Sequence, residues 1–73
     1  MRWEQVVGLN IRRLRKARAI SQEALAHEAK IDMRYLGGIE RGQENPTVAV
    51  IGRIAKLLGV HPSALFAEPK TRT

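Results

Sequence analysis

The chain has 73 residues, and its 13 lysine and arginine residues against 7 aspartate and glutamate residues give a formal net charge of +6. A chain of this length buries only about 60% of its unfolded surface, so we expect a single domain over residues 1–73 with a small, efficiently packed core. The absence of cysteine excludes disulfides and thiolate metal sites, and no stretch approaches the roughly 20 apolar residues of a membrane span.

The first predicted element is a helix over about residues 3–17, because its apolar residues recur at helical spacing. This helix carries the basic run "RRLRKAR" (residues 12–18), with no acidic residue between positions 4 and 23. Such a run suits a polyanion, either nucleic acid or an anionic membrane surface, and is also compatible with a plain solvated helix face. In a helical projection Arg15 lies at the border between the basic and the apolar sides, so we expect it to be partly buried.

Two short helices are predicted next, joined by a tight turn. Ser21 is a suitable N-cap for the first of them, and Asp32 is a suitable N-cap for the second. Lys30 and Ile31 leave room only for a tight turn between the helices, and Gly42 ends the second one. Two short helices joined in this way, inside an all-helical chain with a basic run, fit the helix-turn-helix arrangement of DNA-binding proteins.

The C-terminal part of the chain predicts two further helices. Thr47 caps a fourth helix, and Pro62 starts a short fifth helix. Residues 67–73 are expected to fray. The predicted fold class is therefore all-α: a compact five-helix bundle with its core in residues 3–66.

Five motifs follow one another along the chain in the order "IRRLR", "SQEALA", "IERG", "NPT" and "AKLLGV". As a combined pattern they resemble the Cro/phage-repressor-like helix-turn-helix family of bacterial and phage regulators, over residues 7–66. The resemblance implies a lambda-repressor-like DNA-binding domain, in which the second helix crosses the DNA backbone and the third enters the major groove.

The resemblance also implies which residues touch DNA. Arg34 is the strongest candidate for base contact, because its planar fork can donate two hydrogen bonds to guanine O6 and N7; holding a phosphate is the alternative. Tyr35 either contacts a phosphate or a thymine methyl group, or rests on the second helix. Met33 offers only an apolar contact, or is simply partly exposed. Gln22 is expected to donate to a phosphate and to brace the third helix, and an exposed polar role is its alternative.

Gly37 and Gly38 are adjacent in the third helix, although each glycine costs about 1 kcal/mol relative to alanine there. Gly38 falls where several members of the family carry a longer polar side chain that reads a base. The missing side chains let the backbone approach DNA closely or give a neighbouring arginine room to move, and close helix packing is the alternative. In the following loop we expect phosphate contacts, or ordinary capping and turn roles, for Arg41, Gln43, Asn45 and Thr47.

Glu40 is the acidic residue in an otherwise apolar stretch of the third helix, directly after Ile39. A buried carboxylate needs a partner, and the family pattern pairs this one with Arg15. We expect a structural ion pair that ties the third helix to the first, rather than a catalytic group.

An enzyme is the least supported class of function. His27 and His61 are far apart in the sequence, and the chain shows no carboxylate cluster, nucleophile motif or phosphate-binding loop. We therefore expect no catalytic residue, no metal site, no cofactor, no small-molecule ligand and no membrane partner, in a soluble cytoplasmic protein.

The predicted function is a sequence-specific transcriptional regulator, such as a repressor, that reads a palindromic operator in double-stranded DNA as a homodimer. The fourth helix is apolar over about half its circumference, and either the first helix or a second copy covers this surplus. The stretch "DMRYLGGIERG" also resembles the controller proteins of restriction-modification systems, and an antitoxin with autoregulatory DNA binding is a further alternative. The predicted dimer interface consists of Val50, Leu57, Leu65 and Phe66.

Overall fold

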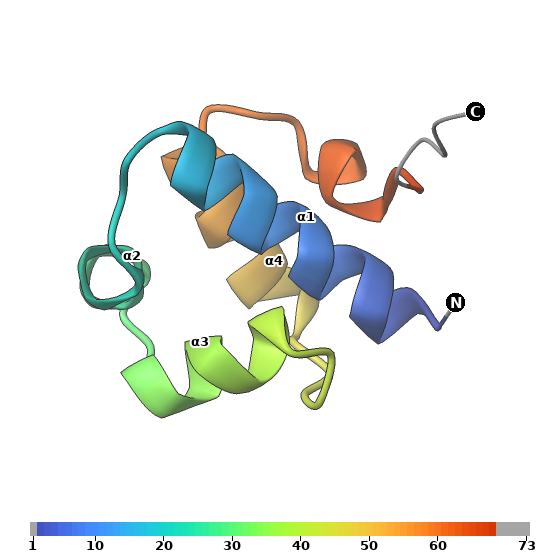
Figure 1. Ribbon diagram of the computed structural model, residues 1–73, viewed down its shortest axis with the longest axis horizontal. Coiled ribbons are helices and arrows are strands. Elements are labelled where there is room, and N and C mark those ends of the chain that lie inside the picture. Colours follow the sequence, from blue (N-terminus) through green and yellow to red (C-terminus); the bar gives the residue numbers. More distant parts are fainter. Residues whose placement is uncertain (1, 69–73) are drawn as a thin grey trace.

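The computed structural model describes residues 2–68 of the chain, and Figure 1 shows them as a bundle of short helices. The elements are α1 (Trp3–Ala17), α2 (Gln22–Ala29), α3 (Met33–Glu40), α4 (Val48–Leu57) and the 3-10 helix η1 (Pro62–Phe66). No strand occurs within residues 2–68. The all-helical fold class is therefore confirmed. None of the helices in this part of the chain has the length and apolar character that crossing a membrane requires.

The prediction of a fifth helix in the all-α bundle is wrong, because this segment is not an α-helix. Residues Pro62–Phe66 form a 3-10 helix, in which the N–H of Ala64 donates to the carbonyl oxygen of His61 at 2.8 Å. So short a segment does not repay the nucleation of an α-helix, and its proline supplies no N–H. The described residues thus contain four α-helices and one 3-10 helix. Of the segment predicted to fray, positions 69–73 lie outside the described residues.

The three predicted N-caps are confirmed. Ser21, Asp32 and Thr47 each accept a backbone N–H from the first turn of their helix, at 2.9, 2.6 and 3.1 Å. Each bond satisfies one of the N–H groups that a first turn leaves without an intrahelical partner. Polar side chains at single positions therefore fix where α2, α3 and α4 begin.

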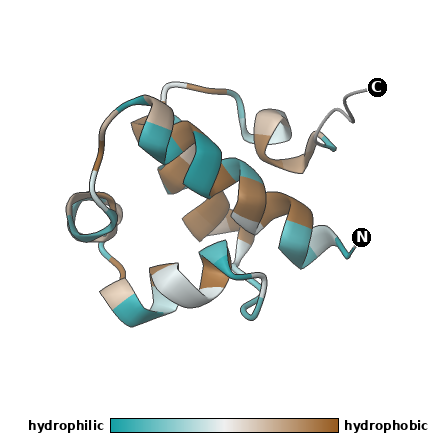
Figure 2. Ribbon diagram, viewed as in Figure 1, coloured by the Kyte–Doolittle hydropathy of each residue, from teal (hydrophilic) through white to brown (hydrophobic). Residues whose placement is uncertain are grey.

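The core lies where the four α-helices and η1 meet. α1 packs against α3 and η1, and α4 packs against α2 and η1. Figure 2 shows α4 in hydrophobic colours along most of its length, whereas the loop after α3 is largely hydrophilic. The large side chains that are fully buried are Ile11, Leu25, Leu36, Ile39, Ile54, Leu58 and Leu65.

The core also corrects the predicted dimer interface. Leu65 is 0% exposed and Val50 is 8% exposed, so neither residue offers a surface to a second copy. The reason is that α2 and η1 of the same chain pack against α4 and cover much of its apolar surplus. The prediction is wrong for these two residues. It stays a prediction for Leu57 and Phe66, which are 37% and 40% exposed.

Asn10 attaches η1 to α1. Its side chain is buried, and its Nδ2 donates to the carbonyl oxygens of Leu65 at 2.9 Å and Ala67 at 2.7 Å. The rings of Trp3 and Phe66 meet edge to face beside this attachment, with their centroids 6.3 Å apart. A single buried amide thus holds the C-terminal turn against the first helix.

Replacement of Asn10 by leucine is expected to lower the free energy of unfolding by about 2 kcal/mol, because two carbonyl groups lose their donor while the branched shape of the side chain is kept. Urea denaturation followed by the fluorescence of Trp3, the only tryptophan of the chain, measures the change. Arg13→Gln is the matched control, since it removes only the 3.3 Å bond from Arg13 Nη2 to Asn10 Oδ1. An equal loss in both variants would contradict the role of the two backbone bonds.

Candidate nucleic-acid interface

α2, α3 and the turn between them form the candidate interface. Only residues 30–32, three in all, separate the two helices. Lys30 adopts a left-handed conformation with φ 61°, and the N–H of Ile31 donates to the carbonyl oxygen of Ala26 at 3.0 Å. These contacts close the end of α2 immediately before Asp32 caps α3. In Figure 1 α3 consequently runs along the outside of the bundle, next to α2.

α3 has one buried side and one exposed side. Leu36 and Ile39 are fully buried, which fixes the rotation of the helix about its own axis. Met33 is 48% exposed, and Arg34 is exposed without an ion-pair partner among residues 2–68. Tyr35 is half-buried and packs against the hydrophobic core. That its ring rests on the second helix stays a prediction. The structure therefore exposes Met33 and Arg34 and leaves Tyr35 half-buried.

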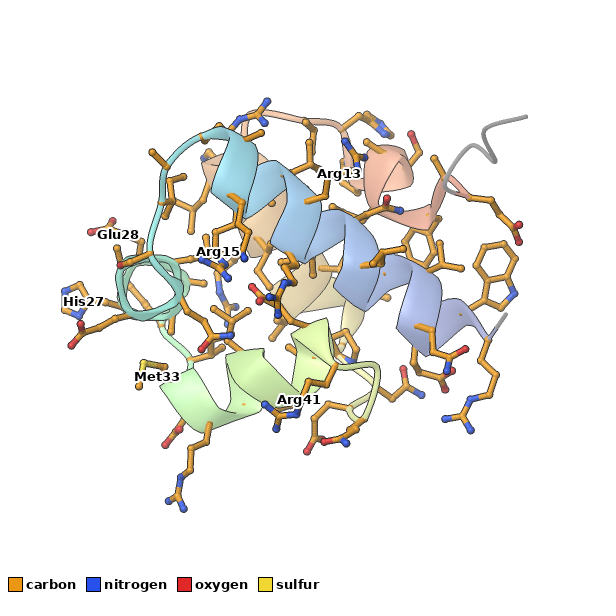
Figure 3. The ribbon with its side chains drawn as sticks, viewed as in Figure 1. Arg13, Arg15, His27, Glu28, Met33 and Arg41 are labelled. Atoms are coloured by element: carbon orange, nitrogen blue, oxygen red, sulfur yellow. The ribbon has the colours of Figure 1, made fainter. Side chains whose placement is uncertain are left out.

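A buried ion pair holds the other end of α3. Nε of Arg15 donates to Oε2 of Glu40 at 2.7 Å, and Nη2 donates to Oε1 at 3.0 Å. Nε2 of Gln22 donates to the same Oε1 at 3.1 Å. Figure 3 shows Arg15 between α1 and α3. The structure thus brings together the predicted pair and adds Gln22, so that α1, α2 and α3 meet at one carboxylate.

The loop after α3 folds back over that helix. Gly42 has φ 76°, a left-handed conformation that favours glycine, and the N–H of Gln43 donates to the carbonyl oxygen of Gly38 at 2.8 Å. Nε of Arg41 donates to Oε1 of Gln43 at 3.1 Å, so these two predicted residues lie together. Figure 3 shows Arg41 at the loop end of α3, on the side away from α1.

Asn45 and Thr47 lie further along the same loop, and both are exposed. The hydroxyl oxygen of Thr47 accepts a hydrogen bond from the N–H of Val50 at 3.1 Å. This is the capping role that the sequence analysis gave as the alternative to a phosphate contact. The hydroxyl hydrogen of Thr47 is still able to donate to a phosphate.

The space beside each adjacent glycine of α3 is filled by a side chain from the same loop. A β-carbon at Gly37 would lie 3.1 Å from Nη1 of Arg41, and one at Gly38 would lie 2.6 Å from Cγ of Glu44. The nearest atoms therefore belong to charged side chains, and not to a closely packed helix backbone. Close helix packing is the wrong explanation for Gly37 and Gly38, because the two glycines make room for Arg41 and Glu44.

Arg13, in the basic run of α1, lies apart from α3. Arg12, Arg13, Lys16 and Arg18 are all exposed, and Figure 3 shows Arg13 on the opposite side of α1 from α3. The structure does not bring Arg13 to the candidate interface. Around α3 itself the exposed charges nearly balance, with Arg34 and Arg41 against Asp32 and Glu44.

The order of helices and the three-residue turn agree with a comparison against known families. The helix-turn-helix family model HTH_3 matches residues 11–65, which includes α2, the turn and α3. The chain belongs to this helix-turn-helix family. The family predicted from the five sequence motifs is thereby confirmed.

Individual members of the family are similar over most of the chain. The immunity repressor protein of Bacillus phage phi105 is 37% identical over 62 residues, which are 85% of this chain and 43% of the repressor. The control protein C.BamHI of Bacillus amyloliquefaciens is 39% identical over 60 residues, covering 81% of this chain and 74% of that protein. The crystal structure of the restriction-modification controller protein C.AhdI from Aeromonas hydrophila superposes with a TM-score of 0.82 at 40% identity, covering 86% of this chain and 96% of that one. The chain thus spans less than half of the phage repressor.

The sequence did not predict that Glu44, in the loop after α3, lies against Gly38. The signal was present, since two adjacent glycines leave a gap on the surface of a helix. What fills the gap depends on how the following loop turns back, and the sequence carries no periodicity from which that turn can be inferred.

Proposed function

We propose that this chain is a sequence-specific transcriptional regulator that reads a palindromic operator in double-stranded DNA as a homodimer, with α3 in the major groove. The observation that carries the proposal is an exposed helix start held by a rigid scaffold. Met33 and Arg34 lie on the surface, while the far end of the same helix is tied to α1 and α2 through Glu40. A reading head must present its side chains in a fixed geometry, and this arrangement supplies that geometry.

The proposed contacts divide into two kinds. Arg34 donates in bidentate fashion to guanine O6 and N7, with Met33 and Tyr35 beside it. Phosphates position the head without reading sequence, and their donors are Gln22, Arg41, Gln43, Asn45 and Thr47. Gln22 Nε2 has two hydrogens, so it keeps one for a phosphate while the other bonds Glu40.

A homodimer follows from the size of the head, because one short helix reaches only a few base pairs. Two heads about 34 Å apart read an inverted repeat on one face of the duplex. Leu57 and Phe66 are the exposed remainder of the predicted dimer interface. We place the regulator in the cytoplasm, where DNA is accessible and where a chain without cysteine needs no oxidising compartment.

A restriction-modification controller protein is the second candidate. One of the similar proteins described above, C.AhdI, carries that name, and the alignment covers 96% of its chain; a second is named control protein C.BamHI. Both candidates use the same DNA-reading surface, so one binding experiment tests what they share.

Selection of bound sequences from random duplex DNA, at a stated salt concentration, tests the proposed function. We expect enrichment of a palindrome with a guanine at a fixed position in each half-site. Arg34→Ala is expected to weaken discrimination at that guanine by about 1 to 3 kcal/mol and to leave the other positions unchanged.

Arg34→Lys is the matched variant, because it keeps the charge and loses the planar fork. Loss of the guanine preference with retained overall affinity would support base reading. An unchanged preference in both variants, with a weaker salt dependence in Arg34→Ala alone, would assign Arg34 to a phosphate. Uniform, strongly salt-sensitive binding by the parent protein would overturn sequence-specific recognition altogether.

A further inference from the structure

The side chain of Glu44 covers Gly38 of α3, which is buried and has no side chain of its own. Gly38 lies four residues after Arg34, which puts the two positions on one face of the helix. A β-carbon at Gly38 would lie 2.6 Å from Cγ of Glu44 and 3.4 Å from its Oε2. A residue of the loop thus supplies the functional group that α3 itself lacks at position 38.

The loop is built to hold Glu44 in this place. The 2.8 Å bond from the N–H of Gln43 to the carbonyl oxygen of Gly38 pins the preceding residue to α3, and left-handed Gly42 permits the reversal. Two residues later, Pro46 is buried and anchors the other side of the loop. Glu44 is therefore confined between two fixed points, although its side chain is exposed.

The charge of Glu44 is not neutralised by the protein. Within residues 2–68 the ion pairs are Arg2 with Glu4 and Arg15 with Glu40, so neither Glu44 nor the nearby Arg41 is paired. A carboxylate on a surface that approaches phosphates is repelled by them. A hydrogen-bond donor on a base edge would offset this repulsion.

We propose that Glu44 is a specificity-determining residue that accepts a hydrogen bond from the N4 amino group of a cytosine in the major groove. Cytosine presents only a donor at this edge, whereas guanine presents N7 and O6 acceptors, thymine presents O4, and adenine places the N7 acceptor beside its amino group. Each acceptor repels a carboxylate, so Glu44 disfavours three of the four bases. This role rests on the proposed function, because it requires α3 to enter the major groove.

Selection from random duplex DNA with the parent protein, Glu44→Gln and Glu44→Ala tests the role. The parent is expected to select cytosine at one position of each half-site. Glu44→Ala is expected to reduce the cytosine preference there by about tenfold. Glu44→Gln is expected to shift the preference towards adenine, whose N6 and N7 match a carboxamide. Thermal melting by circular dichroism should be unchanged in both variants, since Glu44 is exposed.

Glu28→Gln is the matched control. It removes the same charge from an exposed residue of α2, and Figure 3 shows Glu28 on the side of α2 remote from Arg41. A change in base preference confined to the Glu44 variants supports the proposal. Identical selected sequences in all four proteins, or the same shift in the Glu28 control, overturn it and leave the proposed function intact. Absence of any selected sequence with the parent overturns both.

Discussion

Gly8→Ala is expected to lower the free energy of unfolding by about 3 kcal/mol, although alanine is the better helix former. A β-carbon at Gly8 would overlap the carbonyl oxygen of Ile39 and lie 2.8 Å from that of Glu40. Both obstacles are backbone atoms of α3, so no side chain is able to turn away. α1 and α3 must separate instead, and the tightly packed core beneath them loses contacts.

Gly52→Ala is the matched control for this effect. It is the same substitution inside α4, and nothing lies within 4 Å of the added β-carbon. There the helix propensity acts alone, and the free energy of unfolding should rise by about 0.5 to 1 kcal/mol.

Urea denaturation of both glycine variants measures these changes in the free energy of unfolding. In thermal melting, the melting temperature of Gly8→Ala should be about 15 °C lower than that of the parent. A stabilised Gly8→Ala protein would show that the approach of α1 to α3 is not a constraint on the fold. Since this approach sets where the last turn of α3 lies, the destabilised variant should also bind DNA more weakly.

The starts of α2, α3 and α4 could be predicted from the sequence because a single N-cap residue precedes each helix. The signals at Ser21, Asp32 and Thr47 are local, and local hydrogen bonds realise all three. η1 was the exception, since Pro62 marks a helical start equally well for an α-helix and for a 3-10 helix. The burial of Leu65 and Val50 depends on which helix covers α4, which is decided by tertiary packing.

The candidate site shows the same division between local and distant causes. Arg15 and Glu40 were each noticeable in the sequence, one at the border of an apolar face and the other within an apolar run, and the family resemblance supplied their pairing. Gly8 and Glu44 could not be matched in this way. Gly8 is constrained by the close approach of the α3 backbone, and Glu44 is placed beside Gly38 by the reversal of the loop. Neither hydrophobic periodicity nor capping residues indicate such an approach.

Removal of one member of the Arg15 and Glu40 pair is expected to cost more than removal of both. Their side chains are 10% and 1% exposed, so Arg15→Met leaves a buried carboxylate with Gln22 as its remaining side-chain donor. A buried charge without its partner costs about 3 to 5 kcal/mol. Glu40→Leu likewise leaves a buried guanidinium that bonds only the carbonyl oxygen of Ile20, at 2.9 Å.

The double variant of Arg15→Met and Glu40→Leu carries neither charge, and the apolar side chains fill a similar volume. Its loss is expected to stay below about 2 kcal/mol, because buried ion pairs stabilise little relative to apolar groups of the same shape. Urea denaturation of the parent, both single variants and the double variant forms a complete thermodynamic cycle. Strictly additive losses in this cycle would refute the burial of the pair.

The exposed pair of Arg2 and Glu4 provides the comparison within the same chain. Its atoms lie 3.6 Å apart with side chains 74% and 31% exposed, so its coupling energy should be about 0.5 kcal/mol or less. A thermodynamic cycle on Arg2 and Glu4, compared with the cycle on Arg15 and Glu40, separates burial from charge as the cause of the coupling energy.

The double variant of Arg15→Met and Glu40→Leu also tests function, since it is expected to keep its fold but lacks the carboxylate at which α1, α2 and α3 meet. If that junction orients α3, the double variant should melt close to the parent and still bind operator DNA more weakly.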